Sequence, residues 1–480
     1  MKLQELLDGI EIKNGYTLNP EIANVTDDSR KVRNSSAFVC IKGNKNDGHD
    51  YARRAVERGA AVVICERDMG IKNSIIVNDT REAYALMCAN YYGNCHRKLK
   101  MIGVTGTNGK TTTAFIIKKI LEENGYKVGV VGTVGVAIGN EKYPADYTTP
   151  DPSVLHRYLY MMKMAGCDVC IMEASSQALI QKRLYGINFD IGVYTNLSRE
   201  HLDYHKSMES YAEAKAILMQ SSDICVINAD DEYAPFMKKN ARNKTVTYAI
   251  DTDADVMAEK VRLHHDGVEY KLTSKSGSYD IIYNVIGKFS VYNSLAALTV
   301  GMVMNVSMKR AVKAVADMKT VRGRIEKIKN DRKINILIDF AHTPDSLENV
   351  LKTVREVYDK RLITVFGCGG DRDKTKRPIM GKIACKYSDK VFVTSDNPRT
   401  ENPDSIINDI VCGLDKNSYV RITDRTQAIR EAIVEAKPGD TVLIAGKGHE
   451  KYQIFGTEKI HYDEREIVKQ ILDNGANFEK

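Results

Sequence analysis

The sequence predicts an α/β protein built from three successive units. Short apolar runs alternate with helical patterns along the whole chain, as is typical of parallel sheets covered by helices on both faces. A glycine-rich turn lies between one such run and a helix near residue 106. At about 150 residues per domain, a chain of 480 residues has room for three units with a core each. We place them at residues 1–99, 100–326 and 327–480.

The first unit alternates strands with helices and ends in a polar linker at 93–100. Its expected strands are Ser36–Ile41, Ala60–Cys65 and Ser74–Val77, and its helices are His49–Arg58 and Thr80–Tyr91. The second unit opens with a strand at Lys100–Val104 and a helix at Lys110–Asn124. Further strands are expected at Val128–Val131, Val169–Met172, Ile191–Thr195 and Ile224–Asn228, with closing helices at Leu295–Met304 and Lys309–Met318.

A polar segment of mixed charge, Ile325–Asp331, precedes the third unit, where the alternation starts again. Strands are expected at Ile334–Asp339, Leu362–Gly367, Lys390–Thr394 and Thr441–Ala445, and helices at Ser346–Tyr358 and Arg425–Ala436. The third unit is therefore a further α/β domain.

Composition excludes several classes of protein. Hydrophobic residues make up 43% and charged residues 28%, which is ordinary soluble usage and not that of a collagen-like, coiled-coil or disordered chain. The net charge of +7 is spread along the chain and lacks the basic cluster of a nucleic-acid-binding protein. Ten cysteines are too sparse for a disulfide scaffold. We expect a protein that binds small molecules and no nucleic acid.

The sequence also argues against a membrane segment. The longest apolar run, Leu295–Met304, is about half as long as a bilayer crossing requires. Residues 1–11 carry charges at positions where the apolar core of a signal peptide would lie. We therefore expect a cytoplasmic protein.

The turn that follows the strand at 100–104 is the strongest local motif. It reads Gly106, Thr107, Asn108, Gly109, Lys110, Thr111, Thr112. Backbone N–H groups at such a turn and at the helix start can cradle phosphates. Lys110 would reach the β/γ-phosphates, and the Thr111 hydroxyl would bind Mg²⁺. The strict pattern wants glycine where Val104 stands, and a plain strand-to-helix turn is the alternative interpretation. The motif does not choose between kinase, GTPase, motor and ligase.

Other candidates are weaker when each is taken alone. Glu173 ends an apolar strand and could hold a metal or cap a helix. His201 and His205 stand four residues apart, a spacing that is more often structural than zinc-binding. Cys167 and Cys170 form a single pair that we interpret as core. Lys215 lies in a helical stretch and, on physical grounds alone, is a solvated lysine.

Three glycine-rich or turn-rich loops with charged residues end strands of the third unit. They are residues 367–374, 395–399 and 446–450. Arginine there could bind a carboxylate in bidentate fashion, and Asp or Glu could bind an ammonium, which suits a zwitterionic ligand. Ordinary turn chemistry is the alternative.

Taken together, these motifs resemble the Mur ligase family across essentially the whole chain. The order and spacing of the motifs are specific, although no single motif is. The motifs are Thr105–Thr112, Thr148–Pro150, Glu173–Ser176, Asn196–His205, Ala214–Ala216, Asp339–Pro344, Gly369–Lys374, Asp396–Arg399 and Gly446–Glu450. The resemblance implies a three-domain Mur ligase architecture. It would have an N-terminal UDP-muramoyl substrate domain, a central P-loop parallel sheet that binds ATP, and a C-terminal Rossmann-like domain that binds an amino acid.

The resemblance also implies an ADP-forming acid–amino-acid ligase of peptidoglycan precursor synthesis, with ATP as substrate and Mg²⁺ as cofactor. The γ-phosphate would pass to the glutamate side-chain carboxylate of UDP-N-acetylmuramoyl-L-alanyl-D-glutamate. The amine of meso-diaminopimelate would then displace phosphate from the acyl phosphate. A monomer acting on these small molecules is expected. The alternatives within the family are a lysine-adding enzyme and, more remotely, a folylpolyglutamate synthetase. A P-loop GTPase, a nucleic-acid-dependent ATPase and a nucleotide-binding scaffold are the alternatives outside it.

Roles for individual positions follow from the same resemblance. Lys110, Glu173, His201 and Lys215 match catalytic positions. Thr111, Glu173, His201 and Lys215, the last as a carbamate, match metal ligands. Besides the turn at 106–112, the ATP site would include Asn293, Arg324, Asp339 and His342. The UDP-dipeptide site would include Ser29, Thr148, Thr149, Ser175, Gln181 and Arg183. The diaminopimelate site would include Arg372, Asp396, Asn397, Pro398, Arg399, Gly446 and Glu450.

Arg399 bears on the choice of amino acid, because the form Asp396-Asn397-Pro398-Arg399 is associated with diaminopimelate in the family. Diaminopimelate has one carboxylate more than lysine, and lysine would leave the guanidinium without its anion. Two departures from the family pattern stand in the histidine motif. Glu200 replaces the usual aspartate, and Lys206 replaces a common glycine.

Overall fold

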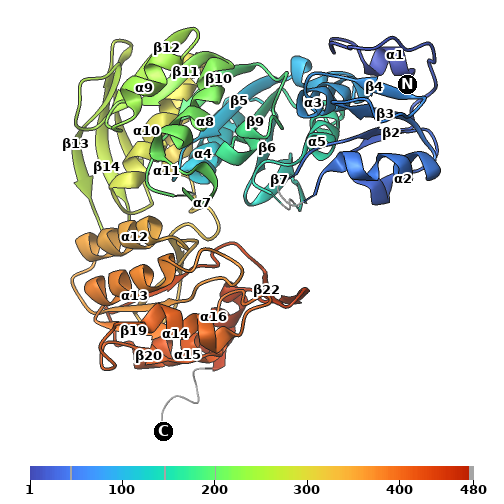
Figure 1. Cartoon of the computed structure of the whole chain (residues 1–480). Coiled ribbons are helices and arrows are strands. Elements are labelled where there is room, and N and C mark those ends of the chain that lie inside the picture. Colours follow the sequence, from blue (N-terminus) through green and yellow to red (C-terminus); the bar gives the residue numbers. More distant parts are fainter. Residues whose placement is uncertain (44–45, 145–146, 201, 475–480) are drawn as a thin grey trace.

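The computed structural model describes residues 1–43, 46–144, 147–200 and 202–474, with the side chains of 202 and 203 left aside. Three larger sheets and one two-stranded sheet follow one another along the chain, and the larger sheets follow the order of the three units of the sequence prediction. The first unit lies beside the central one, and the third lies below the central unit (Figure 1). The α/β class that the alternating pattern predicts is confirmed.

The first unit is built on a four-stranded parallel sheet in the order β1-β2-β3-β4. Its strands are β1 (Asn24–Thr26), β2 (Ser36–Val39), β3 (Ala60–Cys65) and β4 (Ser74–Ile76). Its helices are α1 (Leu3–Leu6), η1 (Ser29–Lys31), η2 (Gly48–Tyr51), α2 (Ala52–Glu57) and α3 (Thr80–Tyr91). The carboxylate of Asp79 caps α3 by accepting from the N–H groups of Arg81 and Glu82, which explains why that helix begins where the sequence predicts.

The segment expected to be a polar linker is more ordered than its composition suggests. A short 3₁₀ helix, η3 (Cys95–Lys98), interrupts it. Its His96 is buried and packs edge-on against His156 of α5 (Pro152–Met164), with ring centroids 5.6 Å apart. The segment is therefore part of the packed junction between the first and central units.

The central sheet has eleven strands in the order β15-β14-β13-β12-β11-β10-β5-β9-β6-β7-β8. The seven neighbouring strands β13, β12, β11, β10, β5, β9 and β6 are parallel to one another. An antiparallel hairpin extends the sheet at each edge. The sheet is thus mixed: the predicted strands are parallel as expected, and the antiparallel hairpins at its edges were not predicted. The strands are β5 (Lys100–Thr105), β6 (Val128–Gly132), β7 (Gly135–Ile138), β8 (Glu141–Tyr143), β9 (Val169–Glu173), β10 (Phe189–Tyr194), β11 (Ser222–Asn228), β12 (Lys244–Ala249), β13 (Val256–Leu263), β14 (Val268–Ser274) and β15 (Gly277–Tyr283).

The longest apolar run of the sequence is a buried helix of this unit. Leu295, Leu298 and Val300 are fully buried in α10, which packs beside α4. No helix in the described part of the chain combines the length and the apolar character needed to cross a bilayer. The central helices are α4 (Lys110–Glu123), α5, α6 (Ser176–Ile180), α7 (Leu202–His205), α8 (Met208–Gln220), α9 (Ala234–Asn240), α10 (Lys288–Val303) and α11 (Met308–Ala316).

The third unit has a six-stranded sheet in the order β16-β17-β21-β18-β19-β20, parallel except for β16. β16 lies within the polar segment 325–331 and opens this sheet. The strands are β16 (Glu326–Ile328), β17 (Asn335–Asp339), β18 (Leu362–Phe366), β19 (Lys390–Val393), β20 (Val420–Arg421) and β21 (Thr441–Ala445), with a separate hairpin of β22 (Tyr452–Phe455) and β23 (Glu458–His461). The helices are α12 (Pro344–Val357), α13 (Lys376–Tyr387), α14 (Pro403–Val411), α15 (Arg425–Glu435) and α16 (Glu464–Asp473).

Candidate active site

The glycine turn lies between β5 and α4, at the carboxyl edge of the central sheet. Gly106 has φ +146°, and a Cβ on it would lie 1.9 Å from the hydroxyl of Thr195, so the turn requires glycine there. The N–H groups of Thr107 and Asn108 donate to the backbone and side-chain oxygens of Asn196, each at 2.9 Å. The turn is therefore held in shape by the segment that follows β10.

Lys110 folds back into this turn. Its ammonium donates to the carbonyls of Gly106 and Thr107, both at 2.8 Å. Burial lowers the pKa of Lys110, while the charge of Glu173 opposes that shift. The result is a cation inside a ring of backbone groups at a helix N-terminus, which is an arrangement suited to an anionic phosphate.

Asn293 supports the turn from α10. A Cβ on Gly109 would lie 2.4 Å from the Asn293 amide oxygen, and that oxygen accepts a hydrogen bond from Thr113 at 3.3 Å. Thr112 lies in the first turn of α4. These two predicted ATP residues are thus brought to the turn, Asn293 by packing and Thr112 by sequence.

Glu173 is fully buried at the end of β9, and its carboxylate has three hydrogen bonds. It accepts from the hydroxyl of Thr111 at 3.0 Å, from the Thr133 N–H at 3.0 Å and from the Thr133 hydroxyl at 2.9 Å. The alternative role as a helix cap is wrong, because the N-cap of α6 is Ser175. A carboxylate beside a hydroxyl is the hard oxygen donor set that Mg²⁺ prefers, so these residues fit the metal that the resemblance implies.

Lys215 contradicts the expectation of a solvated helix lysine. It is 1% exposed in α8, and its ammonium lies 4.4 Å from the centroid of the Tyr211 ring. Burial, followed by repulsion from Lys110, holds the pKa of Lys215 well below its ordinary value. Such an amine is held toward its neutral form, which is the form that reacts with CO₂.

The two histidines of the HxxxH motif have different outcomes. His201 lies outside the described residues, so its predicted role stays a prediction. His205 is buried, with Nε2 2.9 Å from the Ser176 hydroxyl and its ring stacked on Tyr211 at 4.7 Å. His205 is therefore a packed histidine, as the spacing alone predicts. Cys167 and Cys170 are also buried, which confirms them as core.

Arg324, in the segment that leads from the central unit into the third, also reaches the central site. Its Nη2 donates to the Thr111 hydroxyl at 3.3 Å, and its guanidinium lies over the Phe340 ring at 5.0 Å. Asp339 accepts from the N–H groups of Ile325 and Ala341, at 2.7 and 2.8 Å, so its carboxylate holds the chain that carries Arg324. The Nδ1 atom of His342 lies 2.9 Å from the Phe340 carbonyl oxygen, so this ring is held against the segment that follows β17.

A cavity of about 1180 Å³ lies between the first unit and the central one. Ser29 and Gln181, both predicted UDP-dipeptide residues, line it. Arg30, Arg81 and Arg157 line it as well. These arginines come from three separated segments and carry no motif, so no local pattern in the sequence identifies them. Five basic and three acidic side chains line the cavity. A cavity of this size with a surplus of positive charge suits an anionic ligand of nucleotide dimensions.

The other predicted UDP-dipeptide residues connect the cavity to Glu173. Arg183 donates to the side chain of Gln181 at 2.8 Å and to the carbonyl of Thr149 at 2.8 Å. Thr149 donates to the Ser175 hydroxyl at 3.2 Å. The hydroxyls of Thr148 and Thr133 lie 3.1 Å apart, and Thr133 holds Glu173. The six predicted UDP-dipeptide residues thus lie at the cavity or in the hydrogen-bonded chain between the cavity and Glu173.

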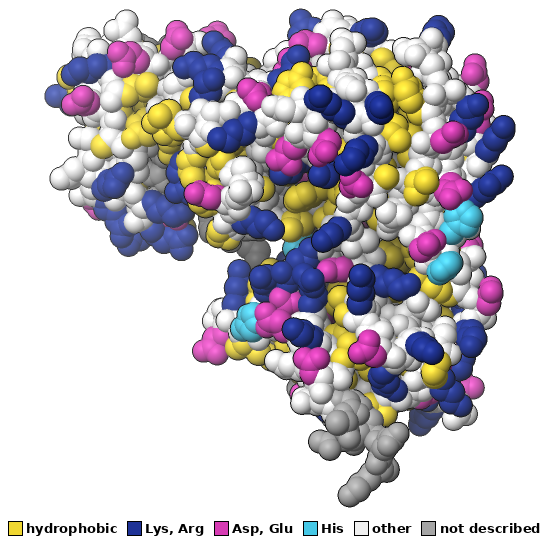
Figure 2. All heavy atoms as spheres, turned by 180° about the vertical axis from the view of Figure 1, so that it is seen from behind, with side chains coloured by type: hydrophobic (Ala, Val, Ile, Leu, Met, Phe, Trp, Pro, Cys, Tyr) yellow, Lys and Arg dark blue, Asp and Glu magenta, His cyan; other side chains and the backbone are white. Residues whose placement is uncertain are grey.

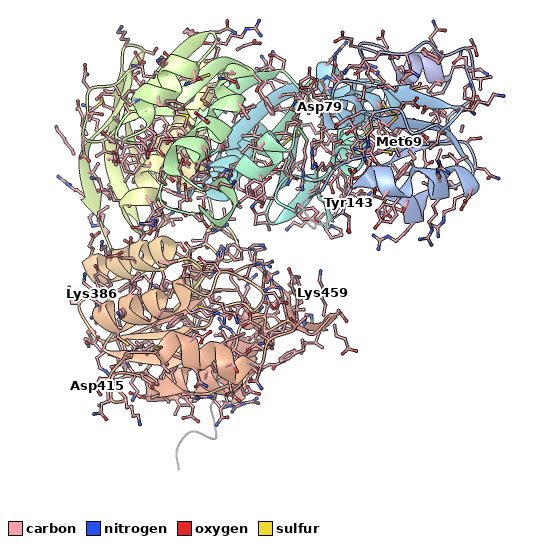
Figure 3. The ribbon with its side chains drawn as sticks, viewed as in Figure 1. Met69, Asp79, Tyr143, Lys386, Asp415 and Lys459 are labelled. Carbon is pink, nitrogen blue, oxygen red and sulfur yellow. The ribbon has the colours of Figure 1, made fainter. Side chains whose placement is uncertain are left out.

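An ion pair joins the first unit to residues 181–183 of the central unit. Lys182 has φ +56° between Gln181 and Arg183, and its ammonium lies 2.7 Å from the carboxylate of Asp79. Asp79, labelled in Figure 3, lies where the first and central units meet. Asp79 therefore caps α3 and also anchors residues 181–183 of the central unit.

The loops of the third unit form a second polar cluster. The Asn397 amide donates to Glu450 at 2.9 Å, and the ammonium of Lys447 donates to both residues at 3.0 Å. Lys447 is fully buried. It stands within the predicted Gly446–Glu450 loop, but no pattern in the sequence indicates its role. Burial alone would raise the pKa of Asp396, but Lys447 and Arg425 hold it below its ordinary value. Gly446 lies against Asp396, since a Cβ there would be 2.9 Å from its carboxylate.

Arg399 is seated on the neighbouring glycine loop. Its Nη1 donates to the Gly370 carbonyl at 2.7 Å, and a Cβ on Gly370 would lie 1.9 Å from the carbonyl of Pro398. Arg372 is exposed and donates to the Asp371 carbonyl at 2.9 Å. Six predicted residues of the amino-acid site thus belong to contacting loops, and Arg372 stands at their exposed edge.

The surface is consistent with anionic ligands at the junction of the units. Figure 2 shows Lys and Arg side chains gathered, with acidic side chains among them, along the edge of the third unit that faces the rest of the molecule. A concave notch lies between that edge and the first unit.

A phosphate-type turn at the carboxyl edge of a parallel-rich sheet, with a buried carboxylate beside its threonine, defines a P-loop nucleotide-binding fold. Two further units with polar loops flank it. Three segments match descriptions of one family. Residues 21–92 match "Mur ligase family, catalytic domain", 104–301 match "Mur ligase middle domain", and 323–448 match "Mur ligase, glutamate ligase domain". The chain belongs to the Mur ligase family.

Individual relatives are similar over their whole length. The chain is 44% identical, over 98% of its own length and 100% of the relative's, to the UDP-N-acetylmuramoyl-L-alanyl-D-glutamate–2,6-diaminopimelate ligase of Clostridium perfringens. It is 42% identical to the enzyme of that name from Clostridium botulinum, over 98% and 99%. A solved structure of an enzyme of the same name matches with a TM-score of 0.72 and 34% identity, over 99% of both chains.

Proposed function

We propose that this chain is an ADP-forming ligase that joins 2,6-diaminopimelate to UDP-N-acetylmuramoyl-L-alanyl-D-glutamate in peptidoglycan precursor synthesis. The observation that carries the proposal is the 44% identity, along the full length of both chains, to a relative of that name. The basic cavity, the glycine turn and the seat of Arg399 support a nucleotide-bearing acceptor, ATP and a dicarboxylic amino acid respectively. We keep the boundaries at 99/100 and 326/327, the monomeric state and a cytoplasmic location as parts of the proposal.

The first half-reaction needs two anions to meet. A carboxylate oxygen of the acceptor attacks the γ-phosphorus of ATP, and ADP leaves. Lys110 and the N–H groups at the start of α4 would bind the phosphates, and Arg324, beside Thr111, would add a cation from the segment that leads into the third unit. Thr111, Glu173, His201 and carbamylated Lys215 would hold Mg²⁺. Magnesium held by these residues would supply positive charge that offsets the repulsion between the two anionic reactants.

Lys215 is suited to the carbamate role by its surroundings. Its neutral amine would add CO₂ and release a proton, which turns a buried amine into an anion. That anion would lie near Lys110, whose charge disfavours the ammonium form of Lys215. The repulsion between two buried cations would thereby become an attraction.

In the second half-reaction the free amine of diaminopimelate attacks the acyl carbon, loses a proton, and phosphate leaves. Asp396 and Glu450 would bind the ammonium of the amino acid, and Asn397, Arg372 and Arg399 would bind its carboxylates. Arg399 distinguishes the proposal from a lysine-adding enzyme, because lysine has no second carboxylate for it.

The test is an assay of amide formation with ATP, Mg²⁺ and the UDP-dipeptide, offered either diaminopimelate or lysine. We expect tripeptide product, with ADP and phosphate in equal amounts, when diaminopimelate is present. Equal or better use of lysine would favour the lysine-adding homologue. Absence of product with both amino acids would contradict the ligase proposal.

A further inference from the structure

The orientation of Arg399 is determined by two segments that hold its two ends. Its backbone has φ +52°. The N–H donates to the carbonyl of Ile454 at 3.0 Å, and the carbonyl accepts from Gly456 at 2.7 Å. Its guanidinium, in contrast, donates a hydrogen bond to the carbonyl of Gly370. The hairpin β22–β23 therefore holds the main chain, while the glycine loop directs the side chain.

The glycine loop can reach Arg399 only because it approaches the 397–399 segment very closely. The Gly370 N–H donates to the carbonyl of Asn397 at 2.9 Å. A side chain at Gly370 would collide with Pro398. The position of the Gly370 carbonyl, and with it the guanidinium of Arg399, consequently depends on what holds this loop from behind.

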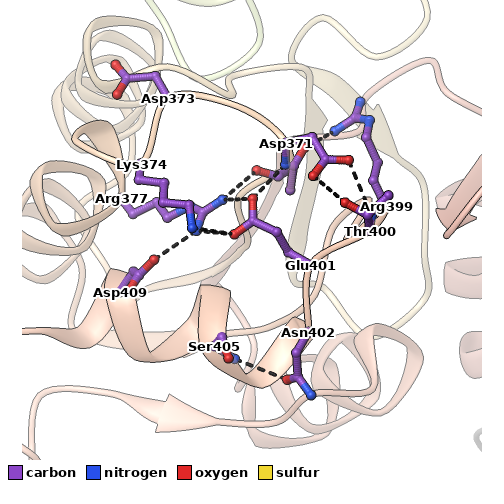
Figure 4. A network of polar contacts seen from close by, with 12 residues as sticks. Asp371, Asp373, Lys374, Arg377, Arg399, Thr400, Glu401, Asn402, Ser405 and Asp409 are labelled. Atoms are coloured by element: carbon purple, nitrogen blue, oxygen red, sulfur yellow. Dashed lines mark hydrogen bonds and ion pairs between the residues drawn. The ribbon is translucent and has the colours of Figure 1, made fainter.

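Arg377, in the first turn of α13, holds the loop from behind (Figure 4). Its side chain is fully buried. Nη1 and Nη2 donate to the two carboxylate oxygens of Glu401, at 2.9 and 2.8 Å. Nη2 also donates to the carbonyl of Gly369 at 3.3 Å, and Nη1 to Asp409 at 2.8 Å. A lysine could not reproduce this bidentate arrangement.

Glu401 carries the contact to the other side of the loop. Its Oε1 accepts from the N–H of Asp371 at 2.6 Å. Asp371 in turn accepts from the hydroxyl of Thr400 at 2.7 Å. The pair of Arg377 and Glu401 therefore holds the loop at Gly369 and at Asp371, one residue on either side of the carbonyl that binds Arg399.

The charges of this pair are balanced. The hydrogen bonds from Arg377 lower the pKa of Glu401 to about 2, with Lys374 contributing. Glu401 is therefore ionised throughout the neutral range. A buried guanidinium that lost this carboxylate would be left partly uncompensated and would draw on other acceptors, so the loop would no longer be held in one place.

We propose that Arg377 and Glu401 are positioning residues that orient Arg399, and that they thereby determine the preference of the site for an amino acid with a second carboxylate. The inference rests on the proposed function. It assigns substrate selectivity to two residues that face the back of the glycine loop, behind the carbonyl that binds Arg399.

The experiment compares Glu401→Gln and Arg377→Lys with Arg399→Ala and with the double variant Glu401→Gln/Arg399→Ala. Steady-state kcat and KM are measured for diaminopimelate, lysine, ATP and the UDP-dipeptide. Arg361→Lys is the matched control, because its ion pair with Glu435 lies at the opposite, amino end of β18. Melting temperatures report whether each variant is folded.

We expect Glu401→Gln and Arg377→Lys to raise the KM for diaminopimelate about tenfold, with KM for ATP and the UDP-dipeptide unchanged, so that the preference over lysine falls. Glu401→Gln should add nothing in the Arg399→Ala background. Folded variants with wild-type selectivity, or equal losses for all substrates, would overturn the inference and leave the proposed function intact. A wild-type protein that does not add diaminopimelate would overturn both.

Discussion

The hydroxyl of Thr111 donates a 3.0 Å hydrogen bond to the carboxylate of Glu173, and so joins the phosphate turn to the end of a strand 62 residues later in the chain. Both side chains are buried. The contact brings a hydroxyl from the start of α4 and a carboxylate from the end of β9 to one point beside Lys110. The chemistry proposed for this protein depends on that convergence.

Replacing Glu173 by Gln should lower kcat on the order of 100-fold, because the neutral amide removes the negative charge that would bind Mg²⁺. The Mg²⁺ concentration needed for half-maximal activity should rise. A magnesium titration of the ligase assay checks this. Glu122→Gln is the control, since Glu122 pairs with Lys118 on the outer side of α4. An unchanged magnesium dependence would contradict the metal role of Glu173.

The ligase activity of the protein should require CO₂, because Lys215 is proposed to act as a carbamate. Because only an amine that can lose its proton forms a carbamate, Lys215→Arg should reduce kcat on the order of 100-fold or more, although ATP still binds. The wild-type protein in CO₂-depleted buffer should lose activity and regain it when bicarbonate is added. Lys118→Arg, at a half-buried lysine of α4 that pairs with Glu122, should respond to bicarbonate as the wild type does. Insensitivity of the wild type to CO₂ would rule out the carbamate.

Arg399→Ala should lower kcat/KM for diaminopimelate about 100-fold, since it removes a charge-assisted contact to the second carboxylate. The value for lysine should change little. The ratio of the two specificity constants is the measurement. Arg430→Ala, which alters an exposed arginine of α15, serves as the control. A parallel loss with both amino acids would mean that Arg399 does not read the second carboxylate.

The pair of His96 and His156 should make the protein sensitive to acid. Burial lowers the pKa of His96 to about 4 and that of His156 to about 3, while the unfolded chain keeps values near 6.5. Above pH 6.5 both histidines are neutral in the folded and in the unfolded state. As the pH falls toward the folded pKa, the unfolded state binds protons that the folded state excludes, and stability is lost.

Between pH 6.5 and about pH 5 the upper limit of this loss is about 2 kcal/mol per histidine. Urea unfolding of His96→Phe/His156→Phe should show a flatter pH dependence than the wild type. His265→Phe, on an exposed loop, should leave the dependence as it is. A double variant with the wild-type slope would place the acid sensitivity elsewhere.

The fold class and much of the candidate site could be predicted from the sequence, because both depend on local patterns. The alternation of strands and helices, the start of α4 at Lys110 and the loops that end β18, β19 and β21 follow from hydrophobic periodicity and turn residues. Both edges of the central sheet escaped prediction, since the parallel pattern gave no signal for the antiparallel hairpins there.

The amino-acid sequence by itself determined which segments carry phosphate-binding and charged loops, and the order in which they occur. Only the tertiary structure decided that Lys215 is buried, that Lys447 ties Asn397 to Glu450, and that Arg377 holds the loop beneath Arg399. The physical reason is that burial and ion pairing depend on neighbours from distant parts of the chain. Arg377 and Glu401 stand 24 positions apart, and no local pattern links them until the loops close on each other.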